Sequence, residues 1–227
     1  MVAIAIIAGM QGEVDAFAPG LGRVENLHGL EVRQLEWEGV PLVLVSAGIG
    51  KVAATLATTA VTIAFAPRLL LALGTAGGLA PGDGAPHWLA RAIQHDYGAA
   101  RGTGFVQYTA GSLPLGEAVA IPFASFAQPA GIDLPEATIA SGDCFVESPE
   151  LSARVRDGLG ASLIDMETAA IAQAAARLGL AWCGIKAASD DANHASAGDF
   201  ESNFRATARR AAAAAERAVP LIAAALG

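Results

Sequence analysis

Three carboxylates in this sequence follow segments that are typical of buried strands. Glu13 comes shortly after the run VAIAIIAG, Glu167 directly after ASLIDM, and Asp190 directly after LAWCGIKAAS. Taken singly, each has a structural explanation, because an acid at the start of a helix caps free N–H groups or complements the helix dipole. Taken together at one edge of a sheet, they suit general acid and base chemistry, in which one group protonates a leaving group and another activates water.

Strands must bring these acids to a common edge. Several apolar runs are hydrophobic at consecutive positions, which is typical of strands covered on both faces. The segment from 29 to 48 predicts a hairpin that turns at Glu38 and Gly39, so the sheet is expected to be mixed. The expected strands are VAIAIIAG, PLVLVSAG, RLLLALG, EATIASG, ASLIDM and LAWCGIKAAS, and the expected helices span 10–17, 50–65, 149–159, 167–178 and 199–226.

The alternation of strands and helices predicts an α/β fold: one three-layer α/β/α domain over residues 1–227, with a central mixed sheet. In such sheets ligands bind beyond the carboxyl ends of the strands. The unusual polar, acidic and glycine residues fall at those ends, in the stretches 9–13, 46–50, 74–78, 141–145, 165–167 and 189–190.

The composition of the chain limits the classes of partner that it can bind. The chain has 227 residues, of which 53% are hydrophobic and 16% charged, and its formal net charge is −8. That charge disfavours nucleic acid and anionic membranes as partners. The apolar N-terminus has no basic residues before it, and threonines and Pro67 interrupt the longest apolar stretch, so neither a signal peptide nor a membrane span is predicted. We expect a cytoplasmic protein, with Cys144 and Cys183 as buried apolar side chains.

Local motifs favour a small polar ligand over a nucleotide cofactor. GIGKVAA superficially matches a dinucleotide fingerprint, but the next strand has no acid to hold a ribose, and Lys51 is followed by Val52 rather than the Ser or Thr of a phosphate loop. The glycines around Thr75 leave N–H groups free to face a ligand. Phe145 fits either a core position or a platform for a flat ring. No third ligand joins Asp190 and the nearby His194, so no metal site is predicted.

The sequence resembles the 5′-methylthioadenosine/S-adenosylhomocysteine nucleosidases, within the nucleoside phosphorylase superfamily. The segments that carry the resemblance are IIAGMQGEV, SAGIGKVAA, GTAGGLAPGD, SGDCF, DMETAAIAQ and KAASDDA, in the family's order and approximate spacing. The resemblance implies a nucleoside phosphorylase-like fold and a hydrolase that releases adenine from either nucleoside through an oxocarbenium-like transition state, with no cofactor and no metal. It also implies a homodimer, in which the region of residues 96–116 helps to close the 5′ side of the pocket.

The same resemblance implies a role for each matching residue. Glu13 would activate the attacking water, Glu167 would accept hydrogen bonds from the ribose hydroxyls, and Asp190, steadied by Ser189, would protonate N7 of the departing adenine. The remaining residues would bind the substrate: Phe145 stacks on the purine, the backbone around Val146 reads its edge, Met166 packs beneath the sugar, Phe200 and Met10 border the 5′ side, and Thr75 and Lys186 complete the set. Lys186 stands where arginine is common in the family and lacks its planar fork, so water or ribose positioning is expected to differ.

Three other functions remain open from the sequence. A phosphorylase on the same fold would need a cationic cradle for phosphate, but no arginine lies near 9–13 or 74–78, and Glu13 would repel the anion. Hydrolysis is therefore favoured over phosphorolysis. The other two are a hydrolase of a different nucleoside, such as futalosine, and a sensor that binds a nucleoside without cleaving it.

Overall fold

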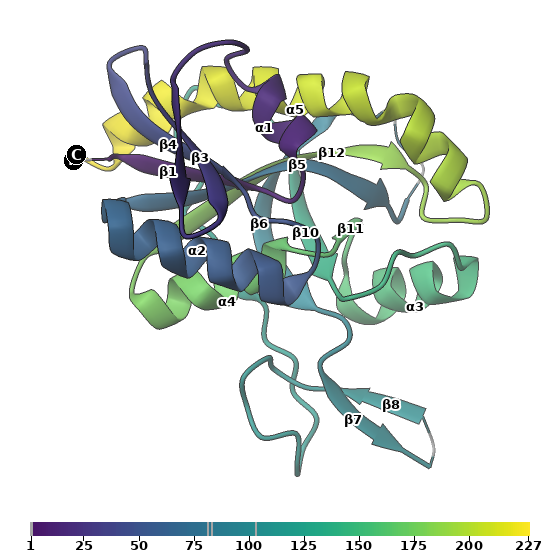
Figure 1. The fold of residues 1–227 in the computed structure, drawn as a ribbon. Helices are drawn as coiled ribbons and strands as arrows, with labels where there is room; N and C mark the ends of the chain where they lie inside the picture. The colour runs from purple at the N-terminus through teal and green to yellow at the C-terminus, as the bar shows by residue number, and fades with distance from the viewer. Residues whose placement is uncertain (1, 81, 83, 103) are drawn as a thin grey trace.

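The protein was analysed as a computed structural model that describes residues 2–80, 82, 84–102 and 104–227. Helices follow several of the strands, but between residues 69 and 141 the described part of the chain forms strands and loops without a helix (Figure 1). The strands are β1 (Ile4–Ala8), β2 (Arg23–Leu27), β3 (Leu30–Trp37), β4 (Val40–Ser46), β5 (Leu69–Gly78), β6 (Pro86–Gln94), β7 (Gly98–Arg101), β8 (Gly104–Gln107), β9 (Phe123–Ala124), β10 (Glu136–Ser141), β11 (Leu163–Asp165) and β12 (Ala181–Asp190). The helices are α1 (Gln11–Ala16), α2 (Lys51–Phe65), α3 (Pro149–Leu159), α4 (Thr168–Leu178) and α5 (Ser196–Ala225).

The central sheet is mixed, as predicted. Its strand order is β11-β10-β6-β12-β5-β1-β4-β3-β2, with β9 paired to β6. β1 runs parallel to β4 and β5, whereas β6 runs antiparallel to β12, and β3 antiparallel to both β2 and β4. β11 also pairs with β5, so the strands β5, β12, β6, β10 and β11 close into a ring at one end of the sheet. This closure brings the carboxyl ends of β5, β11 and β12 together.

Helices cover both faces of the sheet, which confirms the three-layer α/β/α prediction. Ile4 and Ile6 of β1 belong to a core that includes apolar residues of α1 and α5. Ala5 and Ile7 of the same strand belong to a second core, with residues of α2 and α4. Consecutive apolar residues therefore reflect burial on both sides of the sheet. In Figure 1, α1 and α5 lie above the sheet, and α2 and α4 lie below it.

A buried arginine fixes the short helix α1. The guanidinium of Arg33, on β3, donates to the carbonyl oxygens of Val14, Phe17, Ala18 and Leu21. These carbonyls lie at and beyond the carboxyl end of α1, where helix carbonyls lack partners within the helix. Arg33 is only 8% exposed. It anchors α1, which carries Glu13, to the sheet.

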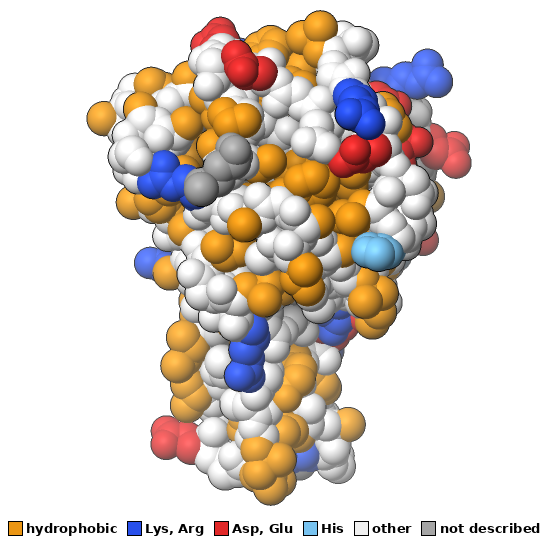
Figure 2. Space-filling model, turned by 60° about the vertical axis from the view of Figure 1, so that its left-hand side comes forward, with side chains coloured by type: hydrophobic (Ala, Val, Ile, Leu, Met, Phe, Trp, Pro, Cys, Tyr) orange, Lys and Arg blue, Asp and Glu red, His pale blue; other side chains and the backbone are white. Residues whose placement is uncertain are grey.

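Several parts of the fold were not predicted from the sequence. The strand β6 was not predicted, because Pro86, Trp88 and Arg91 interrupt a simple apolar run; the proline is tolerated as the first residue of the strand. The glycine-rich region beginning at Gly98 contains the β7–β8 hairpin, which pairs apart from the main sheet. Together with the loop that follows it, this hairpin forms the narrow lower part of the molecule in Figures 1 and 2, which we call the appendage (residues 98–121).

Within the described residues, no helix has both the length and the apolar composition needed to cross a bilayer.

Candidate active site

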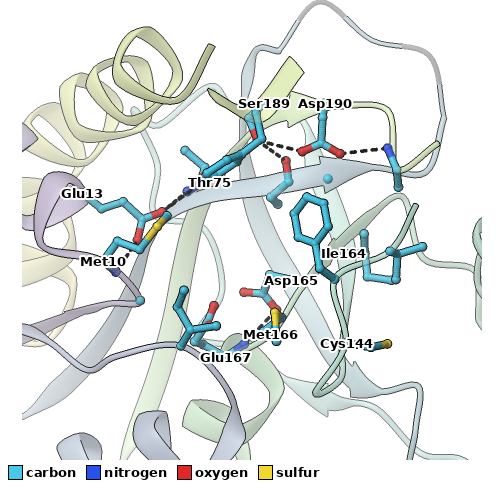
Figure 3. A pocket seen from close by; sticks show the side chains of 18 residues that line it. Met10, Glu13, Thr75, Cys144, Ile164, Asp165, Met166, Glu167, Ser189 and Asp190 are labelled. Atoms are coloured by element: carbon cyan, nitrogen blue, oxygen red, sulfur yellow. Dashed lines mark hydrogen bonds between the residues drawn. The ribbon is translucent and has the colours of Figure 1, made fainter. Parts of the chain in front are cut away.

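A pocket lies beyond the carboxyl ends of β1, β5, β11 and β12, at the edge where the sequence places its acids. The three carboxylates of Glu13, Glu167 and Asp190 all line it, from three sides (Figure 3). Of the eleven residues predicted to act or bind, ten line this pocket, and the exception is Lys186. The full lining consists of Gly9, Met10, Glu13, Ile49, Thr75, Ala76, Gly77, Cys144, Phe145, Val146, Ile164, Asp165, Met166, Glu167, Ser189, Asp190, Ala192 and Phe200.

Glu13 is held from two elements. Its Oε2 accepts a hydrogen bond from the N–H of Met10 at 3.0 Å, at the start of α1. Its Oε1 accepts from the N–H of Thr75 at 2.6 Å and from the hydroxyl of Thr75 at 2.9 Å, on β5. A side chain at Gly74, where φ is +141°, would overlap the carboxylate, so this approach requires glycine. A carboxylate has about four acceptor sites, which leaves capacity for a further donor such as water.

Glu167 projects into the pocket from the start of α4. Its Oε1 accepts a hydrogen bond from the N–H of Gly50 at 2.9 Å, at the start of α2. Burial and the nearby Asp165 carboxylate raise the pKa of Glu167 to about 7, with a smaller contribution from Glu13. The positive charge of Lys186 and the N–H of Gly50 oppose that rise. Glu167 is therefore expected to change its charge near neutral pH.

Asp190 ends β12 and is only 8% exposed. Its Oδ2 accepts from the hydroxyl of Ser189 at 3.0 Å, and its Oδ1 accepts from the N–H of Ala192 at 3.0 Å. The pairing of β12 with β5 shifts register between Ala188 and Asp190. Such a bulge re-aims side chains, and both Ser189 and Asp190 line the pocket here.

Lys186, which was predicted to bind the substrate, does not line the pocket. Its side chain lies behind the pocket, where Nζ is 3.2 Å from Asp165 Oδ2 and donates to the carbonyl oxygen of Thr75 at 3.2 Å. Burial alone would lower the pKa of Lys186, but the carboxylates of Asp165, Glu13 and Glu167 outweigh it and raise the pKa above its usual value. Lys186 is therefore a buried cation that faces three acids, and its ammonium is already bound to protein oxygens.

Aromatic side chains border the open side of the pocket. The ring of Phe145, which is 49% exposed, meets the ring of Phe200 edge to face, with 6.2 Å between centroids. Phe200 also contacts Phe204 at 5.3 Å. Phe145 is thus available to a ligand rather than buried in the core. Cys144 is exposed and lines the pocket, so the prediction that it is buried was wrong, whereas Cys183 is buried as expected.

Sequence reasoning missed one polar contributor and several apolar ones. The polar contributor is Asp165, which accepts hydrogen bonds from the N–H and hydroxyl of Thr168 at the start of α4. It also pairs with Lys186 and lines the pocket. Its position directly before Met166 and Glu167 was the available signal. Ile49 and Ile164 carried no signal, because apolar residues beside strands are ordinarily core. Among the described residues, no three His, Cys, Asp or Glu side chains are grouped to hold a metal ion.

The fold and the pocket define a class of protein: an α/β protein with a ligand site at the strand ends, bordered by three carboxylates and by aromatic rings. The chain belongs to the phosphorylase superfamily, whose family model matches residues 3–222. It is 32% identical over 225 residues to a 5′-methylthioadenosine/S-adenosylhomocysteine nucleosidase of Tolumonas auensis, covering 92% of this chain and 95% of the relative.

Solved structures share the fold. A 5′-methylthioadenosine/S-adenosylhomocysteine nucleosidase from Helicobacter pylori, with butyl-thio-DADMe-Immucillin-A, superposes with a TM-score of 0.82 at 23% identity, covering 97% of this chain and 98% of that one. A futalosine hydrolase mutant of Helicobacter pylori has a TM-score of 0.81, also at 23% identity, with coverage of 97% and 99%. At these identities the likeness establishes the nucleoside phosphorylase-like fold, which the sequence had predicted.

Proposed function

We propose that the protein hydrolyses the N-glycosidic bond of 5′-methylthioadenosine, S-adenosylhomocysteine, or both, and releases adenine. The observation that carries the proposal is the convergence of Glu13, Glu167 and Asp190 on one pocket from three different elements. Hydrolysis of such a bond passes through an oxocarbenium-like state, which needs an acid for the leaving group and a base for water. The name of the Tolumonas auensis relative supports the choice of nucleoside.

The residues divide this chemistry between them. Asp190 protonates N7 of adenine as the bond from the base to C1′ of the ribose breaks. Glu13 takes a proton from water as the water oxygen bonds to C1′. Glu167, when ionised, accepts hydrogen bonds from the ribose hydroxyls. Phe145 stacks on the purine, Val146 presents its backbone to the purine edge, Met166 packs beneath the sugar, and Met10 and Phe200 border the 5′ substituent.

Phosphorolysis fits the pocket less well. No Lys or Arg is among its lining residues in the described part of the chain, and Lys186 already binds Asp165 and Thr75. A phosphate dianion would therefore lie beside acidic groups without a cationic partner. Water has no such requirement.

Base release from a panel of nucleosides tests the function. Purified protein is given 5′-methylthioadenosine, S-adenosylhomocysteine, adenosine, inosine and futalosine, with and without phosphate, while free base and sugar are quantified. We expect adenine and the free sugar from the first two substrates at rates that do not depend on phosphate. Ribose 1-phosphate products would establish a phosphorylase, preference for futalosine would establish the other hydrolase, and no base release at all would support a sensor.

The raised pKa of Glu167 predicts how activity depends on pH. Ionised Glu167 binds the ribose hydroxyls, so kcat/KM for 5′-methylthioadenosine is expected to rise with pH up to an inflection near pH 7, the pKa of this group in the free protein. The measurement is a pH profile of kcat/KM for the wild type and for Glu167→Gln. A rising limb at the same pH in Glu167→Gln would assign the titration to another group.

The same group makes an opposite prediction for stability. The folded protein holds the Glu167 proton up to about pH 7, whereas the ordinary pKa of 4.5 applies in the unfolded chain. Between these two values the folded state binds more protons, so the free energy of unfolding contributed by Glu167 falls as pH rises through this window. Denaturant titrations of the empty protein at pH 5 and pH 8 measure the difference. It is expected to shrink in Glu167→Gln.

A homodimer is also part of this proposal. One stripe of α2 exposes Val52, Leu56 and Ile63, which are 71%, 65% and 78% exposed. Ile49, just before the start of this helix, lines the pocket. The appendage also exposes hydrophobic side chains, among them Phe105, Leu113 and Leu115, and Figure 2 shows hydrophobic side chains interspersed with polar ones there. A second copy bound to this stripe would cover exposed apolar surface and reach the rim of the pocket.

A cytoplasmic location is proposed as well, since both cysteines are free thiols.

Introducing charge on this stripe tests the homodimer. We expect the wild type to have the mass of a dimer by light scattering, and Leu56→Glu to have the mass of a monomer, because a buried unpaired charge disfavours association. KM for 5′-methylthioadenosine is expected to rise with the loss of the partner at the rim. Ala224→Glu, an exposed position on α5, is the control. A wild type that is monomeric at micromolar concentrations contradicts the proposal.

A further inference from the structure

The start of α2 contacts two parts of the candidate site. The N–H of Gly50 donates to Glu167 Oε1 at 2.9 Å. The next N–H, of Lys51, donates to Asp143 Oδ1 at 2.8 Å. Asp143 begins the segment 143–146, which we call the purine loop because the proposed function places adenine against Phe145 in it. Two consecutive amides therefore fix the ribose side and the purine side of the pocket relative to each other.

The side chain of Lys51 adds a second set of contacts beneath this loop. Its Nζ lies 2.7 Å from Asp96 Oδ1 and 3.8 Å from Asp143 Oδ2, and it donates to Gln94 Oε1 at 3.4 Å. The N–H of Asp143 donates in turn to Asp96 Oδ2 at 2.9 Å. Lys51, Asp96 and Asp143 thus form a closed cluster in which every member contacts the other two.

The charges of the cluster make Lys51 its central member. Burial would raise the pKa of Asp96, but the ammonium of Lys51 and the N–H of Asp143 outweigh this effect and lower it. Asp96 is therefore ionised at neutral pH. Without Lys51, two acids would face each other with no cation between them, and mutual repulsion would favour separation of the purine loop from the end of β6.

We propose that Lys51 is a positioning residue for substrate binding, which acts by tying the purine loop to Asp96 and to the start of α2. Neither Lys51 nor Asp143 lines the pocket, so any effect on the substrate must pass through the loop. The identity of the substrate in this inference rests on the proposed function. The role of Lys51 in holding the purine loop rests only on the contacts described above. The cluster also adjoins the appendage, because the amide of Gln107 on β8 donates to the carbonyl oxygen of Gln94.

Hydrogen exchange tests the positioning without a substrate. Lys51→Met removes the ammonium but keeps the backbone N–H that binds Asp143. We expect amide exchange in residues 142–147 to become about three- to tenfold faster in Lys51→Met, as for the loss of a partly exposed ion-pair network. Lys51→Arg should restore most of the protection. Arg23→Met, which removes one exposed charge on the edge strand β2, is the matched control.

Kinetics on the same variants test the effect on the substrate. Lys51→Met is expected to raise KM for 5′-methylthioadenosine about three- to tenfold while kcat changes less than about twofold, since the acids of the pocket keep their partners. Unchanged exchange in 142–147, unchanged KM, or equal effects in Arg23→Met would each overturn the inference. A wild type that cleaves no nucleoside would refute the proposed function instead, and exchange would still decide the role of Lys51.

Discussion

Replacement of Asp190 by asparagine is expected to lower kcat for 5′-methylthioadenosine by about 10²- to 10⁴-fold, the usual contribution of a general acid. Asparagine has the same shape and can still accept a hydrogen bond from the N–H of Ala192, which lies 3.0 Å from Asp190 Oδ1. Its amide cannot transfer a proton to N7 of adenine. The departing base would then leave as an anion, which raises the barrier by roughly 3 to 5 kcal/mol.

Two comparisons separate this chemical effect from damage to the pocket. Asp191→Asn alters the neighbouring exposed acid and should retain wild-type kcat. A ribosyl substrate whose leaving group departs as a stable anion needs no proton, so Asp190→Asn should cleave it at close to the wild-type rate. Undiminished turnover of 5′-methylthioadenosine by Asp190→Asn would remove Asp190 from the role of acid.

The acid positions could be predicted because strand ends are visible in a sequence. Runs of consecutive apolar residues mark strands buried on both faces, and Glu13, Glu167 and Asp190 follow three of them. Parallel neighbours in an α/β sheet end at one edge, so residues far apart in the chain meet there. This explains Glu13 and Asp190, because β1 and β12 run parallel to β5 on either side of it. Glu167 reaches the same pocket in another way, because β11 runs antiparallel to β5 and closes against its end.

The direction of individual side chains could not be predicted in the same way. Lys186 and Asp190 are four residues apart on β12, so a regular strand would point both side chains to the same face of the sheet. Lys186 instead pairs with Gly74 inside the sheet, and the register of β12 shifts before Asp190. The register shift leaves no pattern in the sequence. The strand β6 escaped prediction because its place between β10 and β12 is set by long-range pairing rather than by its own pattern.

Removal of the buried cation should affect the stability of the whole molecule. Lys186 is 2% exposed, and its Nζ lies 3.2 Å from Asp165 Oδ2. Lys186→Met has a similar volume but leaves the Asp165 carboxylate buried without its cation. Loss of one partner of a buried ion pair typically costs about 3 to 5 kcal/mol in the free energy of unfolding. Denaturant unfolding of the wild type and Lys186→Met measures this difference.

The double variant Lys186→Met with Asp165→Asn shows whether the cost comes from the unpaired acid. It removes both charges, so it should recover much of the stability that the single variant loses. The pH dependence of activity should also respond to the loss of Lys186, because its positive charge opposes the rise in the pKa of Glu167. In Lys186→Met the rising limb of kcat/KM is expected to move above pH 7, while Lys186→Arg keeps it in place. The prediction is wrong if Lys186→Met unfolds at the wild-type denaturant concentration and keeps the wild-type pH profile. The buried pair would then contribute neither to the free energy of unfolding nor to the pKa of Glu167.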